Sequence, residues 1–220
     1  PSDHPLTLAK MAQTGTESFL ERREMGVLNI GETGNVTVDG TTYELANGEV
    51  LYIGMGSGPV EFSGAGRFYI LSAPAHHSYP TTHIRQSDAN RVELGSKEQA
   101  NKRVIFQLLH PDVCKSCQLV MGYTQLEEGS IWNTMPAHVH DRRMEAYLYF
   151  NVDAEQRVFH FMGEPTETRH LVMANEEAVI SPPWSIHSGA GTGAYTFCWG
   201  MAGDNVDFTD MDMVEMGDLR

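Results

Sequence analysis

Cysteine, positive charge and long apolar runs are all scarce in this chain. Its 220 residues include three cysteines, an odd count that does not suggest a disulfide framework. Only 15 residues are Lys or Arg against 29 Asp or Glu, which gives a formal net charge of −14. Such an acidic chain is a poor nucleic-acid binder, because phosphate binding needs a positive face. No apolar run approaches the roughly 20 residues of a membrane span, so we expect neither nucleic acid nor a membrane among its partners.

The cysteines that are present indicate no zinc knuckle or thioredoxin-like site. Cys114 and Cys117 form a C-x-x-C, but no second pair accompanies them, so ordinary strand or turn cysteines are the better interpretation. Twelve methionines fit a reducing compartment. No signal peptide is visible. The chain begins with proline rather than methionine, which leaves room for an upstream segment or a removed leader.

Helical periodicity is also nearly absent, with residues 97–102 as the one weak candidate. The stretch 34-GNVTVDGTTYEL-45 has the alternation and the Asp-Gly pair of a β-hairpin. Many other short alternating or apolar runs follow it, up to 195-YTFCWGM-201. Regularly spaced short strands predict an all-β sandwich or barrel. We expect the acidic tail, residues 204–220, to be solvated.

The sequence contains an internal repeat. The segment 21-ERREMGVLNI-30 aligns with 141-DRRMEAYLYF-150 at an offset of 120, and 45-LANGEVLYIGMGSG-58 resembles 173-MANEEAVISPPWSI-186 at an offset of 128. A duplicated β-domain is the simplest explanation. Residues 78–101 are polar and suit a connection. We therefore predict an N-terminal domain, residues 1–90, and a C-terminal domain, residues 91–220.

Candidate metal ligands occur in the second copy alone. His138 and His140 are two residues apart, so they would share one face of a strand, and Glu145 would begin the returning strand of a hairpin. Two imidazoles and a carboxylate on one face are the start of a metal site. A fourth candidate, His187, follows a proline turn. The corresponding residues of the first copy ligate no metal well, being Ser18, Leu20, Met25 and, at the second offset, Pro59.

The spacing H-x-H-x4-E followed by P-x4-H is similar to the metal-binding pattern of cupins. The longer stretches 131-IWNTMPAHVHDRRMEAYLYF-150 and 168-TRHLVMANEEAVISPPWSIHSGAGTGAYTFCWGM-201 resemble the 5-dehydro-4-deoxy-D-glucuronate isomerases, also called 4-deoxy-L-threo-5-hexosulose-uronate ketol-isomerases, of bacterial pectin breakdown. This resemblance covers the chain from about residue 15 onward. It implies an all-β fold of two tandem cupin (jelly-roll) domains, one zinc per chain, a homohexamer and a cytoplasmic location. The zinc ligands would be His138, His140, Glu145 and His187.

The implied reaction converts the aldose form of a deoxy-keto-uronate, 5-dehydro-4-deoxy-D-glucuronate, into the ketose 3-deoxy-D-glycero-2,5-hexodiulosonate through a metal-stabilised enediol. Zinc suits three imidazoles and a carboxylate, although Fe²⁺, Mn²⁺ or Ni²⁺ fits the same set. Tyr147 and Tyr149 share a strand face with Glu145 and are candidates for the proton shuttle. An arginine would bind the sugar-acid carboxylate, and Arg103 and Arg169 are the favoured candidates over the repeated pair Arg142 and Arg143.

Three other functions remain open at this stage, because a cupin fold does not fix a function. An iron-dependent cupin dioxygenase would use the same four ligands. A non-catalytic storage cupin would tolerate loss of the ligands, which are all present here. The 5-deoxy-glucuronate isomerase of inositol breakdown shares the fold and the reaction type.

Overall fold

The computed structural model describes residues 4–204 and 206–220, and their regular structure is almost entirely β. Its helices are three short 3-10 turns, η1 (Ala12–Thr14), η2 (Gln86–Asp88) and η3 (Met216–Asp218). The weak helical candidate at residues 97–102 contains only turns and irregular chain. In the described part of the chain, no helix has the length and apolar character needed to span a membrane. The prediction of an all-β fold is confirmed.

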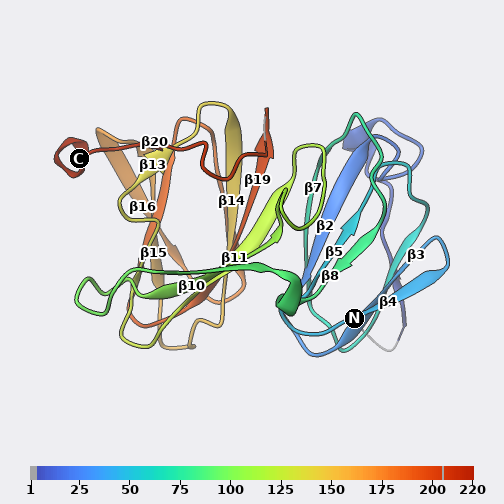
Figure 1. The fold of residues 1–220 in the computed structure, drawn as a ribbon, viewed down its shortest axis with the longest axis horizontal. Coiled ribbons are helices and arrows are strands. Elements are labelled where there is room, and N and C mark those ends of the chain that lie inside the picture. The colour runs from blue at the N-terminus through green and yellow to red at the C-terminus, as the bar shows by residue number, and fades with distance from the viewer. Residues whose placement is uncertain (1–3, 205) are drawn as a thin grey trace. The chain divides into compact units, whose positions relative to one another are not determined.

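The chain forms two compact units (Figure 1). Unit 1 runs as far as Asn90 and also includes Leu108–Val120, while unit 2 comprises Arg91–Gln107 and Met121–Arg220. A buried carboxylate holds the returning segment within unit 1: Glu24 accepts hydrogen bonds from the backbone N–H groups of residues 117–119 at 2.7–2.8 Å. Cys114 and Cys117 in this segment are free thiols.

Unit 1 contains two four-stranded sheets, with the orders β1-β6-β3-β4 and β7-β2-β5-β8. The predicted hairpin at residues 34–45 is present, and Asp39 and Gly40 at its tip both have positive φ (49° and 78°), as a two-residue hairpin turn requires. Side chains from both sheets pack into one apolar core. The strands are β1 (Leu6–Thr7), β2 (Arg23–Asn29), β3 (Gly34–Val38), β4 (Thr41–Leu45), β5 (Val50–Ile53), β6 (Val60–Gly64), β7 (Phe68–Pro74) and β8 (Thr82–Ile84).

The second half of the chain repeats this arrangement with additions. A six-stranded sheet has the order β17-β14-β19-β11-β10-β9, a four-stranded sheet has the order β12-β18-β15-β16, and β13 pairs with β20. The strands are β9 (Asn90–Leu94), β10 (Arg103–Leu109), β11 (Val120–Leu126), β12 (Trp132–Asn133), β13 (His138–Val139), β14 (Arg143–Phe150), β15 (Val158–Glu164), β16 (Glu167–Met173), β17 (Glu177–Ser181), β18 (Ile186–Gly191), β19 (Thr196–Gly203) and β20 (Asp212–Met213).

The internal repeat of the sequence is also visible in the strand pairing of the two units. In unit 1, β2 lies between β7 and β5, and in unit 2 the corresponding β14 lies between β19 and β17. Met25 pairs with Ile53, and Glu145 pairs with Ser181, so the offset of 120 holds along this strand. In the other sheet, β3 corresponds to β15 and β6 to β18: Gly34 pairs with Gly64 as Val158 pairs with Gly191. Four residues before Gly64 is Val60, and four residues before Gly191 is His187. Val60, rather than Pro59, is therefore the equivalent of His187 in unit 1.

Candidate metal centre and substrate pocket

Four side chains that belong to neighbouring segments of unit 2 meet at one point. They are His138 of β13, His140 of the following turn, Glu145 of β14 and His187 of β18, and their nearest ligand atoms all lie within 4.8 Å of one another. Glu145 Oε2 is 3.0 Å from His140 Nε2 and 2.8 Å from His187 Nε2. His187 Nε2 is also 3.0 Å from His138 Nε2. All four residues are buried.

The local structure that delivers His138 and His140 differs from the predicted hairpin. Residues 141–142 do form a turn, but β13 does not pair with β14. It pairs with β20 instead, with His138 opposite Met213. The hairpin prediction was therefore wrong, because the partner strand comes from the tail, which local sequence pattern could not identify. The tail is likewise not simply solvated.

Hydrogen bonds on the far side of two imidazoles fix which nitrogen faces the cluster. His140 Nδ1 lies 2.7 Å from the carbonyl oxygen of Asp210, and His187 Nδ1 lies 3.3 Å from that of Ser185. A carbonyl only accepts, so each Nδ1 carries a proton and the Nε2 lone pair points inward. Neutral imidazoles and a carboxylate packed this closely repel one another unless protons or a cation lie between them. The donor set therefore fits a divalent cation.

The electrostatics of the cluster favour the metal-binding forms of its members. Burial, together with the nearby His187, lowers the pKa of His138 from 6.5 to about 3, which leaves its imidazole neutral. Burial alone would oppose ionisation of Glu145. The neighbouring imidazoles of His187 and His140 outweigh this effect of burial, so the pKa of Glu145 is held well below its usual value. Neutral imidazole and carboxylate are the ligand forms.

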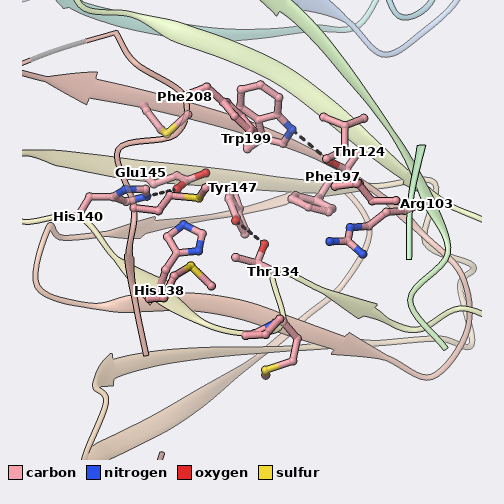
Figure 2. A pocket seen from close by; sticks show the side chains of 17 residues that line it. Arg103, Thr124, Thr134, His138, His140, Glu145, Tyr147, Phe197, Trp199 and Phe208 are labelled. Carbon is pink, nitrogen blue, oxygen red and sulfur yellow. Dashed lines mark hydrogen bonds and ion pairs between the residues drawn. The ribbon is translucent and has the colours of Figure 1, made fainter. Parts of the chain in front are cut away.

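A pocket of about 230 Å³ opens beside this cluster. His138, His140 and Glu145 form one part of its lining, and Arg103 is the one Lys or Arg among the described residues that line it. Tyr147 also faces the pocket and shares a 2.9 Å hydrogen bond with Thr134. Figure 2 shows Arg103 and His140 at opposite ends of the view, with Tyr147 and Thr134 between them. The rest of the lining is mainly apolar: Leu94, Ile105, Met135, Pro136, Phe197, Trp199, Met201, Phe208, Met211 and Met213, with Thr124.

The four predicted catalytic candidates have different surroundings. Tyr147 and Arg103 line the pocket. Burial raises the pKa of Tyr147 well above its usual value, so the hydroxyl keeps its proton. Tyr149 is buried further along β14, where its hydroxyl shares a 2.8 Å hydrogen bond with His160 Nδ1. Arg169 is exposed on β16 and forms an ion pair with Glu167, so the structure does not bring it to the pocket.

Sequence reasoning missed two parts of this site. Thr134 has a φ of 47°, an unusual left-handed conformation for a β-branched residue, and no propensity rule predicts it. The second part is the segment that contributes Phe208, Met211 and Met213 to the lining. The one sequence signal for this segment is the alternation of Asp with Phe and Met in 207-DFTDMDM-213. A fully solvated tail would not need these apolar side chains, so they indicate packing against the protein.

The fold and the four-residue cluster define a two-cupin protein, and the described residues contain one candidate metal centre, which lies in unit 2. The sequence model of the KduI/IolB family matches residues 4–216. A protein of Cereibacter sphaeroides (strain ATCC 17029) named 4-deoxy-L-threo-5-hexosulose-uronate ketol-isomerase is 64% identical over 220 residues, which span 100% of this chain and 80% of the relative. A protein of Agrobacterium fabrum with the same name is 62% identical over the same spans. The chain belongs to the KduI/IolB family.

Solved structures support the fold at much lower identity. An IolB-like protein from Salmonella typhimurium superposes with a TM-score of 0.75 at 16% identity, over 98% of this chain and 84% of that one. The oxalate decarboxylase of Lactobacillus farciminis gives a TM-score of 0.62 at 10% identity, over 90% of this chain and 74% of that one. These likenesses concern the fold alone, and they confirm the predicted cupin architecture.

Proposed function

We propose that this protein is an aldose–ketose isomerase that interconverts 5-dehydro-4-deoxy-D-glucuronate and 3-deoxy-D-glycero-2,5-hexodiulosonate with the help of a metal ion. The observation that carries the proposal is the 62–64% identity, over the whole chain, to relatives named 4-deoxy-L-threo-5-hexosulose-uronate ketol-isomerase. The pocket beside the four-residue cluster supplies the groups that such a reaction needs.

His138, His140, Glu145 and His187 would hold the metal, and zinc is the ion we propose, since it favours N/O ligand sets of this kind. When bound, the ion supplies Lewis acidity that polarises a substrate carbonyl and stabilises developing negative charge. The Nδ1–H bonds of His140 and His187 to backbone carbonyls keep their Nε2 lone pairs directed at the ion.

The remaining pocket residues bind and orient the substrate. Arg103 offers a guanidinium that suits the substrate carboxylate, and it lies away from the cluster in the pocket (Figure 2). A six-carbon sugar acid held by Arg103 at one end would present its C1–C2 end to the cluster. The hydroxyls of Tyr147 and Thr134 lie between and can hydrogen-bond the substrate oxygens. The apolar walls limit access of water to the reacting carbons.

The experiment that tests this proposal measures isomerase activity and metal content on the same preparation. We expect about one zinc per chain, activity that disappears on chelation, and recovery when zinc is restored. The assay should be run with 5-dehydro-4-deoxy-D-glucuronate and with 5-deoxy-glucuronate in parallel. Preference for the second substrate would move the assignment to the other branch of the family, and iron with oxygen uptake would move it to a dioxygenase.

We also propose a homohexamer located in the cytoplasm, on the family resemblance. Light scattering coupled to size-exclusion chromatography tests the assembly, with an expected mass of six times 24.5 kDa. A monomer that retains full activity would remove the hexamer from the proposal without affecting the reaction.

A further inference from the structure

The segment 207–213, here called the strap, is held to unit 2 by a buried arginine. The Arg143 side chain is only 1% exposed, and its guanidinium donates to three backbone carbonyls of the strap, those of Asp207, Phe208 and Asp210. Its neighbour Arg142 is partly exposed and forms ion pairs with the carboxylates of Asp210 and Asp212. The two adjacent arginines therefore bind the strap in two ways, one through its main chain and one through its side chains.

The strap contacts the metal-ligand cluster directly. The carbonyl of Asp210, which accepts from Arg143, also accepts the Nδ1–H of His140 at 2.7 Å. The strap ends in β20, which pairs with β13, so that Met213 lies opposite His138. Two of the four candidate ligands thus depend on the strap, one for the orientation of its ring and one for its strand partner.

The same strap forms part of the pocket wall. Phe208, Met211 and Met213 all line the pocket, and the Phe208 ring lies 5.2 Å from that of Trp199. A shift of the strap would therefore change the cluster and the substrate wall together.

The equivalent arginines of unit 1 have different partners. Arg23 donates to the side chain and carbonyl of Ser72 on the neighbouring strand β7, and Arg22 is exposed beside Glu21. The arginine pair is present in both copies, but its contacts differ between them. In unit 1 the arginine binds its own sheet, and in unit 2 it binds the segment that contacts His140.

We propose that Arg143 is a positioning residue of the metal site. It fixes the strap, and through the Asp210 carbonyl it fixes the ring orientation of His140, while Arg142 clamps the outer side of the same segment. The strap thereby couples metal binding to the shape of the substrate wall. This inference rests on the proposed metal-dependent isomerase activity.

The test compares Arg143→Lys with the matched variant Arg23→Lys of unit 1. Lysine keeps the charge but lacks the planar fork that binds three carbonyls. Each protein is measured for zinc affinity by competition with a chromophoric chelator, for the visible spectrum of its Co²⁺-loaded form, and for kcat and KM. We expect Arg143→Lys to weaken zinc binding about tenfold, the lower end of the loss seen for partners of metal ligands. Its Co²⁺ spectrum should change and its KM should rise, whereas Arg23→Lys should match the wild type in all three.

Each outcome is decisive. If Arg143→Lys lowers only thermal stability and keeps the wild-type zinc affinity, Co²⁺ spectrum and KM, the residue is merely structural and the inference is overturned. If Arg143→Lys does not fold, Arg142→Gln replaces it with Arg22→Gln as its control, and a smaller loss of zinc affinity in the same direction is expected. Unchanged zinc affinity in Arg142→Gln would then overturn the inference. A wild-type protein that binds no metal would overturn the proposed function itself and this inference with it.

Discussion

The two units share a strand arrangement, but their interior side chains differ at several matched positions, where those of unit 1 are apolar and those of unit 2 are polar. At six matched positions, unit 1 has apolar residues that are at most 2% exposed and belong to a single core cluster, and unit 2 has polar residues that form the ligand cluster and its surroundings. The pairs are Leu20 and His140, Met25 and Glu145, Val27 and Tyr147, Val36 and His160, Ile53 and Ser181, and Val60 and His187.

This comparison shows that the fold does not need the polar set. Full burial of an aliphatic side chain stabilises a fold by roughly 1.5–3 kcal/mol, whereas a buried polar group must find partners to avoid a penalty. Unit 1 has the stabilising choice at every one of these positions. The polar choice in unit 2 therefore indicates selection for a site, and each exchange between the two sets becomes an experiment.

The largest effect is expected from removing one ligand. His140→Ala takes away one of four metal-facing groups, so zinc binding and isomerase activity should be lost while the fold persists. The matched variant Leu20→Ala should keep zinc and activity but destabilise the protein by about 2–5 kcal/mol, as for a buried leucine. Elemental analysis and denaturant unfolding measure both. Full zinc occupancy in His140→Ala would show that the ligand assignment is wrong.

The next largest effect concerns the two predicted arginines. Arg103→Gln should lower kcat/KM about 10- to 100-fold, mainly through KM, because a hydrogen-bonded charge partner of the substrate is lost. Arg169→Gln serves as the control, since Arg169 is exposed and pairs with Glu167 outside the pocket. Steady-state kinetics on both variants decide the matter. Equal effects, or a larger one for Arg169, would contradict the placement of the substrate carboxylate.

A smaller effect should separate the two tyrosines of β14. Tyr147→Phe removes the hydroxyl that faces the pocket and should lower kcat by about 2- to 10-fold, the range for one neutral hydrogen bond. Tyr149→Phe should leave kcat near the wild-type value but cost about 1–3 kcal/mol of stability, because His160 loses a buried partner. Stopped assays and thermal unfolding on the pair measure this. A larger kcat loss in Tyr149→Phe would reverse the assignment of the two roles.

A fourth effect concerns the pH dependence of stability. Burial, together with nearby His187, lowers the pKa of His160 from 6.5 to about 4 in the folded protein. Between these values the unfolded chain takes up a proton that the folded protein does not. His160 therefore contributes a loss of stability as pH falls from about 6.5 toward 4, of up to roughly 3 kcal/mol.

His160→Val, which copies Val36, should make that fall shallower. The hydrogen-bonding groups that face His160 are the Tyr149 hydroxyl and Ser181 Oγ, and neither ionises in this range. Denaturant unfolding of both proteins with the metal removed, at pH values from 4 to 7, isolates the effect. An unchanged slope would mean that His160 is already charged or exposed in the folded protein.

Local pattern in the sequence was enough to predict the strands, the repeat and the residues of the cluster. Alternation and the Asp-Gly pair predicted the β3–β4 hairpin, and spacing brought His138, His140 and Glu145 together as candidates. Long-range pairing was beyond local pattern, because β13 pairs with a strand more than seventy residues away. The sequence also could not predict which residues of one strand face reach the pocket. Tyr147 and Tyr149 share a face, but only Tyr147 lines the pocket.

The strap also has a consequence for the order of events during biosynthesis. A nascent chain that has emerged as far as His187 already carries all four candidate ligands, yet His140 lacks the Asp210 carbonyl, which comes 70 residues after it. An ion captured at that stage would meet an imidazole that is free to rotate and to present either nitrogen. If the four residues hold a metal as proposed, we expect stable loading to be a late step in maturation, one that follows synthesis of the strap rather than synthesis of the ligands.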